Sequence, residues 1–162
     1  MAHNLFIVRH AQTHSGQHYN SDKERELKPE GITQATQLGK YLNALNYNVD
    51  LIISSDAVRA KTTALLIAAE IKYPAHQIQF DEKIYAGSLH EVLDLIQQTP
   101  ESIEHILMIG HYPTIVEVNN YLSNTQKTIM ETCELTLLNF DTQWSALLEG
   151  MGELKLNYHP PY

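Results

Sequence analysis

The stretch Leu5-Phe6-Ile7-Val8-Arg9-His10-Ala11 decides how this chain folds. Its four leading apolar residues form a short continuous run, which is typical of a strand buried on both faces of a parallel sheet. Arg9 and His10 are therefore expected at the carboxyl end of that strand, the edge at which open α/β sheets bind ligands. A cation beside an imidazole at this place indicates an anion site with a nitrogen nucleophile.

Two further apolar runs, residues 51–53 and 106–109, predict buried strands of the same kind. Segments with helical spacing of apolar residues alternate with these runs, and residues 77–80 predict a short additional strand. This alternation predicts an α/β fold with a mostly parallel, mixed sheet flanked by helices on both faces. The expected helices cover about residues 29–45, 57–72, 89–96 and 114–122.

The last quarter of the chain has a different pattern. Residues 135–140 and 145–148 flank a polar segment, which predicts an antiparallel C-terminal hairpin. Residues 154–156 are expected to add one edge strand. Near the other end, residues 12–28 are polar and predict a long surface loop, a kind of segment that is often functional in compact domains.

The composition is that of a globular protein. The 162 residues, 43% of them apolar and 19% charged, predict one domain, residues 1–162. A net charge of −8 argues against a broad basic surface, so neither nucleic acid nor an anionic membrane is an expected partner. The single cysteine, Cys133, and the lack of a visible signal peptide or membrane-spanning run predict a cytoplasmic protein.

Polar side chains follow each of the three predicted parallel strands, in Arg9-His10, residues 55–59 and Gly110-His111. Because the carboxyl ends of parallel strands meet at one edge, these side chains are expected to line one crevice. Two arginines and two histidines there suit a phosphate dianion, since guanidinium groups pair with its oxygens bidentately. Taken alone, Arg59 is more simply a solvated surface residue. In the first turn of a helix it opposes the helix dipole, and such broken local rules concentrate at functional sites.

Three motifs in this order resemble the signatures of the histidine phosphatase superfamily, whose fold is phosphoglycerate mutase-like. They are Val8-Arg9-His10-Ala11 with Arg25-Glu26-Leu27-Lys28-Pro29-Glu30-Gly31, then residues 54–64, and then Gly110-His111-Tyr112-Pro113. The order, spacing and short length are most similar to the SixA-type phosphohistidine phosphatases. The resemblance covers nearly the whole chain.

The resemblance implies a role for each matching residue. His10 would be the nucleophile that accepts the phosphoryl group, and Arg9, Arg59 and His111 would complete the phosphate pocket. Attack by His10 would give a phosphohistidine intermediate that water then hydrolyses, without a metal ion or another cofactor. The residues expected to support or contact the substrate are Arg25, Ser55 and Tyr112.

Two positions depart from the family pattern, with Asp56 where a proline is usual and Tyr112 where an asparagine is frequent. The general acid is less clearly marked. Asp81, Glu82 and Glu91 are candidates by position, but Glu91 also completes a Ser-x-x-Glu capping box, so Glu82 is our choice of proton donor. A missing strong acid favours phosphohistidine over a phosphate ester, because a leaving imidazole is easily protonated near neutral pH.

Three functions remain open at this point. The first is a phosphatase acting on phosphohistidine in a protein, and the second is a phosphatase of a small phosphate ester or nucleotide. The third is a non-catalytic module that binds phosphate, which would be indicated by loss of Arg9, His10, Arg59 or His111, yet all four are present. The expected partner is thus a phosphorylated protein or a small phosphate substrate, and the sequence makes no prediction about oligomeric state.

Overall fold

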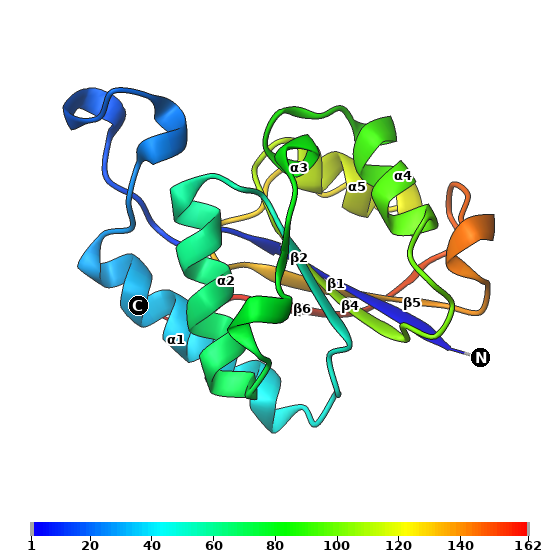
Figure 1. Ribbon diagram of the computed structural model, residues 1–162. Coiled ribbons are helices and arrows are strands. Elements are labelled where there is room, and N and C mark those ends of the chain that lie inside the picture. The colour runs from blue at the N-terminus through cyan, green and yellow to red at the C-terminus, as the bar shows by residue number, and fades with distance from the viewer. Residues whose placement is uncertain (1, 162) are drawn as a thin grey trace.

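The computed structural model describes residues 2–161 and places all its strands in one sheet, with the order β3-β2-β4-β1-β5-β6 (Figure 1). β1 pairs in parallel with β4, β4 with β2, and β2 with β3, whereas β5 pairs antiparallel with both β1 and β6. The predicted mixed and mostly parallel sheet is therefore confirmed. The strands are β1 (His3–Arg9), β2 (Leu51–Ser54), β3 (Gln79–Phe80), β4 (His105–Gly110), β5 (Leu135–Phe140) and β6 (Glu153–Tyr158).

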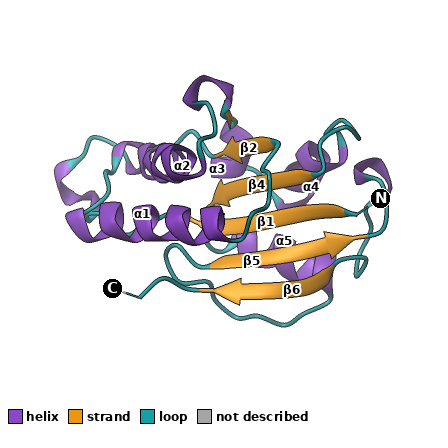
Figure 2. Cartoon of the chain, turned by 90° about the horizontal axis from the view of Figure 1, so that it is seen from below, coloured by secondary structure: helices purple, strands orange, loops and turns teal. Residues whose placement is uncertain are grey.

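Helices cover both faces of this sheet, as the sequence predicts (Figure 2). α1 and α2 lie on one face, and α3, α4 and α5 lie on the other. None of the helices within residues 2–161 combines the length and apolar character needed to cross a lipid bilayer. The helices are α1 (Pro29–Ala44), α2 (Val58–Ile71), α3 (Glu82–Ala86), α4 (Leu89–Gln97) and α5 (Thr114–Ser123). The short 3-10 turns are η1 (Gly16–His18), η2 (Asp22–Glu24), η3 (Ala75–Gln77) and η4 (Trp144–Ala146).

β1 forms the centre of two apolar clusters, one on each face of the sheet. Leu5 and Ile7 pack with side chains of α4 and α5, while Phe6 and Val8 pack with side chains of α1 and α2. All four are fully buried, and burial of a side chain of this size contributes about 1.5–3 kcal/mol. Packing from both sides thus holds β1 rigidly, and with it the Arg9-His10 pair at its carboxyl end.

The C-terminal part corrects one sequence-based expectation. Residues 145–148 are not a strand, because residues 145 and 146 belong to η4 and residues 147 and 148 are irregular. The next strand, which pairs antiparallel with β5, is β6. The reason is a tertiary contact of Trp144, which is fully buried and donates its indole N–H to the carbonyl of Ile103 at 2.7 Å. A twelve-residue connection, residues 141–152, therefore joins the two strands instead of a tight turn.

The polar loop of residues 12–28 leaves the sheet at the carboxyl end of β1 and contains η1 and η2 (Figure 1). An isolated antiparallel bridge joins Thr13 to Leu27, and the Lys28 N–H donates to the Gln12 carbonyl at 3.0 Å. Gly31 permits this closure, since a Cβ at that position would lie 2.2 Å from the Gln12 carbonyl oxygen. The two ends of the loop are thus held together beside the edge of the sheet.

Candidate active site

The carboxyl ends of three strands converge on one cavity. Arg9 ends β1 and lies opposite Gly110 of β4, so His10 and His111 follow neighbouring strands. Arg59 reaches the same place from the first turn of α2, which follows β2. The cavity has a volume of about 370 Å³, and its lining residues are Arg9, His10, Gln12, Thr13, Arg25, Lys28, Arg59, His111, Tyr112 and Thr132.

His10 presents a neutral imidazole to this cavity. Its Nδ1 lies 2.8 Å from the carbonyl oxygen of Ala11, and because a carbonyl only accepts, the hydrogen is on Nδ1. Burial lowers the pKa of His10 to about 3, and the nearby charges of His111, Arg59 and Arg9 act in the same direction. At neutral pH the Nε2 atom therefore carries a free lone pair, which is the form that a nitrogen nucleophile requires.

Arg9 is held by the segment that precedes β5. Its Nη1 donates to the carbonyl of Met130 at 2.8 Å, and its main-chain N–H donates to Glu134. The Nε atom is buried and has no hydrogen-bond partner among the described residues. The guanidinium also lies 5.6 Å from the centre of the Tyr112 ring. A partly buried cation with a buried, unused donor beside a cavity is suited to bind an anion.

Arg59 is fixed from the other side by Asp22, a residue of η2 that the sequence did not single out. Its Nη2 donates to Oδ2 of Asp22 at 2.9 Å, and its Nη1 donates to the Asp22 carbonyl at 2.8 Å. The hydroxyl of Tyr85, also missed from sequence, donates to the same carboxylate at 2.9 Å. Hydrogen bonds from Arg25, Tyr85 and Arg59 hold the pKa of Asp22 well below its usual range. Asp22 is thus an ionised partner for Arg59.

Arg25 organises the loop and also lines the cavity. Its Nη1 donates to Oδ1 of Asp22 at 2.9 Å, its Nε donates to the His14 carbonyl, and its Nη2 donates to the hydroxyl of Thr13 at 2.6 Å. The two halves of the loop are therefore tied through one guanidinium. A second ion pair, Lys23 to Asp56 at 2.8 Å, fastens η2 to the start of α2.

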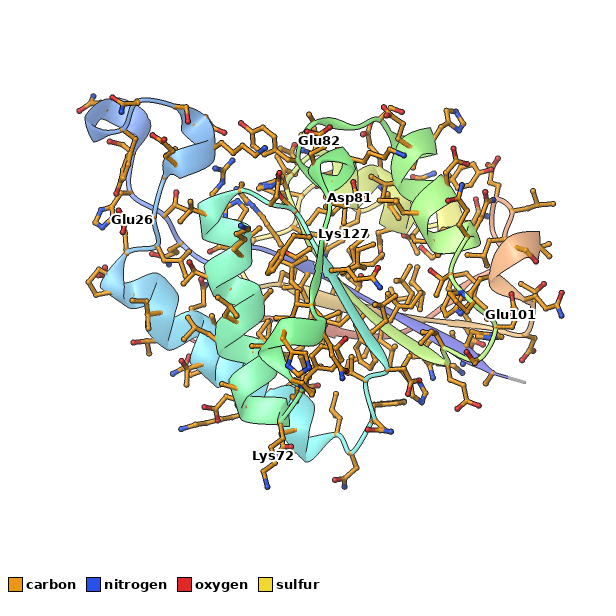
Figure 3. All side chains as sticks on the ribbon, in the orientation of Figure 1. Glu26, Lys72, Asp81, Glu82, Glu101 and Lys127 are labelled. Atoms are coloured by element: carbon orange, nitrogen blue, oxygen red, sulfur yellow. The ribbon has the colours of Figure 1, made fainter. Side chains whose placement is uncertain are left out.

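The remaining sequence-predicted residues differ in their distance from the cavity. Tyr112 lines the cavity and is 44% exposed. Ser55 is buried and does not line the cavity, but its hydroxyl lies 2.7 Å from Nε2 of His111. Glu82 does not line it either and projects from α3, with its side chain exposed (Figure 3). The functional roles of Tyr112, Ser55 and Glu82 stay predictions.

The chemistry of the cavity is that of a phosphate site. Three arginines and one lysine line it, and no carboxylate does among the described residues. A cavity of this charge attracts a dianion, and the neutral imidazole of His10 lines it. Within residues 2–161, no group of three His, Cys, Asp or Glu side chains is arranged to hold a metal ion.

Comparison with known proteins agrees with this chemistry. Residues 5–101 match the family model of the histidine phosphatase superfamily (branch 1). A Saccharomyces cerevisiae protein named as a broad-specificity phosphatase is 36% identical over 70 residues, which cover 42% of this chain and 30% of that protein. The family model thus covers more than half of the chain.

Solved structures show the same fold over nearly the whole length. The Nakamurella multipartitia protein described as a candidate phosphohistidine phosphatase SixA has a TM-score of 0.83 and 25% identity, with coverage of 99% of this chain and 97% of that one. A protein histidine phosphatase SixA complexed with tungstate also has a TM-score of 0.83, with 19% identity and coverage of 96% of both chains. The chain therefore belongs to the histidine phosphatase superfamily (branch 1), and its fold is that of the SixA-type, phosphoglycerate mutase-like proteins.

Proposed function

We propose that this protein is a phosphatase that removes the phosphoryl group from phosphohistidine in a protein, through a phosphorylated His10 intermediate. Nε2 of His10 attacks phosphorus, the bond from phosphorus to the substrate nitrogen breaks, and the leaving imidazole takes a proton from solvent. Water then attacks phosphorus, the bond to Nε2 breaks, and inorganic phosphate and neutral His10 are released. Two easier steps replace one difficult step.

The other residues of the cavity stabilise charge during both steps. Phosphoryl transfer depends mainly on positioning and on neutralising the equatorial oxygens, and Arg9, Arg59 and His111 surround the place where these oxygens would lie. The hydrogen bond from Nδ1 of His10 to the Ala11 carbonyl keeps the ring oriented throughout. These side chains supply the positive charge that the reaction requires, so the proposed steps use no metal ion.

The observation that carries the substrate assignment is the lack of a carboxylate among the described residues that line the cavity. A departing alkoxide needs a proton donor, which contributes typically about 100- to 10,000-fold to the rate. Asp22 is ionised by its partners, and Glu82, whose role as proton donor stays a prediction, does not line the cavity. A departing imidazole has little need of one, because its conjugate acid has a pKa of about 6.5.

A second candidate keeps the same site and changes the substrate to a small phosphate ester. The related yeast protein is named as a broad-specificity phosphatase, which supports this alternative. An aryl ester, whose phenolate leaves easily, would suit a cavity without an acid better than an alkyl ester would. The two candidates therefore differ most clearly in the rates for alkyl phosphates.

A substrate panel tests the assignment. We would compare a histidine-phosphotransfer domain phosphorylated on histidine with p-nitrophenyl phosphate and glycerol phosphate. We expect kcat/KM for the phosphohistidine substrate to exceed that for glycerol phosphate by at least about 100-fold, since the alkyl ester lacks its acid. A preference for the alkyl ester would overturn the phosphohistidine assignment.

His10→Ala and His90→Ala form a matched pair in this panel. His90 is an exposed histidine on α4 and lines no part of the cavity, so its replacement should leave turnover unchanged. His10→Ala should lose turnover with every substrate and form no acid-labile phosphoenzyme in quenched-flow experiments. Undiminished hydrolysis by His10→Ala would rule out the nucleophile.

A further inference from the structure

Ser55 occupies a buried position between β2 and α2, next to the phosphate cavity but not in it. Its main-chain N–H donates to the carbonyl of Ile109 at 3.0 Å, which fixes it beside the end of β4. Its hydroxyl has two neighbours. The N–H of Ala57 donates to Oγ at 3.1 Å, and Nε2 of His111 lies 2.7 Å from the same oxygen.

The hydrogen-bonding capacity of a hydroxyl decides which partner donates in the second contact. A serine hydroxyl has one hydrogen to donate, and the Ala57 N–H already occupies one of its lone pairs. If Nε2 of His111 carried a hydrogen, both neighbours would donate to Oγ, and the Ser55 hydrogen would need a third partner. The structure gives the buried Oγ no such partner among the described residues. Ser55 therefore donates to Nε2.

This assignment determines the tautomer of His111. Burial, together with the charge of Arg59, lowers the pKa of His111 to about 4, so the imidazole is neutral at pH 7 and carries one hydrogen. With Nε2 accepting from Ser55, that hydrogen is on Nδ1. The Nδ1 atom is buried and has no hydrogen-bond partner among the described residues, although the ring lines the cavity. The Nδ1–H group of His111 is therefore an unused donor beside the cavity, and a phosphoryl oxygen bound there would be its acceptor.

We propose that Ser55 is a positioning residue that holds His111 in the Nδ1–H tautomer, so that His111 donates a hydrogen bond to a phosphoryl oxygen. The proposal rests on the proposed function for the identity of the anion, and it changes the expected part of Ser55 from contacting substrate to orienting the group that does. The opposite tautomer would place the lone pair of Nδ1 against a phosphoryl oxygen. It would thereby lose the bond and add repulsion.

Ser54→Ala is a matched control for Ser55→Ala. Ser54 is the preceding residue and is equally buried, but its hydroxyl donates to the Ser55 carbonyl at 2.9 Å rather than to His111. Ser55→Ala also removes the acceptor of the Ala57 N–H. Ser55→Thr keeps a hydroxyl and with it both hydrogen bonds, so it tests whether the hydroxyl is what matters at this position, and the tautomer of His111 reports on the bond to His111 itself. Thermal unfolding of all three variants establishes that each is folded.

Nitrogen-15 NMR of histidine-labelled protein reads the tautomer directly, with the His111 signals assigned by their loss in His111→Gln. We expect a pyrrole-type Nδ1 and a pyridine-type Nε2 for His111 in the wild type, in Ser54→Ala and in Ser55→Thr. Ser55→Ala should show a mixture of tautomers or the reversed one. A pyridine-type Nδ1 in the wild type, or an unchanged tautomer in Ser55→Ala, would overturn the proposal.

Inhibition by inorganic phosphate and turnover supply the functional readout. We expect Ser55→Ala to bind inorganic phosphate about 10- to 100-fold more weakly than Ser54→Ala, because a hydrogen bond to a charged group is lost. Ser55→Thr should recover most of this loss. If phosphohistidine proves not to be a substrate while tautomer and phosphate affinity change as expected, the proposed function fails and the role of Ser55 stands. Equal phosphate affinity in Ser55→Ala and Ser54→Ala would overturn that role.

Discussion

The floor and the rim of the cavity are built in different ways. The floor consists of His10, His111 and Arg9 at the ends of β1 and β4, where the sheet and its two apolar clusters hold them. The rim consists of the loop of residues 12–28, which projects from the body of the molecule and is fastened by ion pairs such as Asp22 to Arg59 (Figure 1). Burial lowers the pKa values of the two histidines of the floor, whereas the partly exposed ion pairs of the rim are weakened by salt. The two regions should therefore respond to different perturbations.

The largest expected effect is a loss of stability in acid, which originates in the floor. The pKa values of His10 and His111 are lowered to about 3 and about 4 in the folded protein, against about 6.5 in an unfolded chain. From about pH 6.5 down to about pH 4 the unfolded state binds more protons, so the free energy of unfolding falls as pH falls. Each histidine contributes a slope of up to ~1.4 kcal/mol per pH unit within this window. Urea unfolding at pH 7, 6 and 5 measures it.

The contribution of the floor to this pH dependence is measured with His111→Gln. The control is His90→Gln, because His90 is an exposed residue of α4. We expect the pH dependence of the unfolding free energy to become flatter by about one proton in His111→Gln and to stay as in the wild type in His90→Gln. An unaltered slope in His111→Gln would show that the buried imidazole does not limit stability in acid.

Two cations of the same cavity should differ strongly in their effect on activity. Arg9 is part of the floor, and Lys28, at the base of the loop, lines the cavity while remaining partly exposed. Arg9→Met should lower kcat/KM by about 100-fold or more, since two charge-assisted hydrogen bonds of roughly 1.5–3 kcal/mol each are lost. Lys28→Met should cost less than about fivefold, because an exposed charge is screened. Equal losses would remove the distinction between floor and rim.

Closure of the loop base should depend on one glycine. Gly31→Ala places a Cβ 2.2 Å from the Gln12 carbonyl oxygen, so α1 and the loop must separate, at a cost of about 1–3 kcal/mol in stability. Gly16, within the loop, is a suitable control because a Cβ there meets its nearest atom, Cδ of Arg25, at 3.6 Å. Gly16→Ala should change the unfolding free energy by less than about 0.5 kcal/mol in chemical denaturation. A stable Gly31→Ala protein would show that the loop base tolerates widening.

The smallest effect is expected at the exposed carboxylate of the rim. Asp22→Asn keeps the shape of the side chain and the main-chain bond to Arg59 but removes the ion pairs with Arg59 and Arg25. We expect kcat/KM to fall by less than about tenfold, and the gap to the wild type to narrow at high salt as the ion pairs are screened. Steady-state kinetics at low and high sodium chloride measure this. A salt-independent loss as large as that of Arg9→Met would place Asp22 with the floor.

Much of the fold was predictable because its central strands are unambiguous. The runs at residues 5–8, 51–53 and 106–109 are apolar without interruption, and each became a buried strand. The strand expected at residues 145–148 was wrong because Trp144 is buried and bonded to the Ile103 carbonyl, and the chain around it forms η4. β6 is mostly exposed and so carried a weaker signal.

The floor of the site was predictable from the same strands, whereas the rim was not. Arg9, His10 and His111 were brought together because parallel strands end at one edge, and Arg59 came with them from α2. Asp22 and Tyr85 were missed, because Asp22 binds Arg59 and Tyr85 at sequence separations that no periodic pattern reveals. Their meeting depends on the path of a polar loop, which local propensity does not specify.

The amino-acid sequence by itself determined the sheet, its helical layers and the position of four cationic or imidazole side chains at one edge. It could do so because continuous apolar runs must be buried as strands of a sheet. The carboxyl ends of parallel strands then lie at one edge, so the residues that follow these strands meet there. Only the tertiary structure decided the protonation of His10, the orientation of His111 by Ser55 and the pairing of Asp22 with Arg59. Burial among residues from distant parts of the chain lowers the pKa of His10, and hydrogen bonds between residues far apart in the chain set the other two properties.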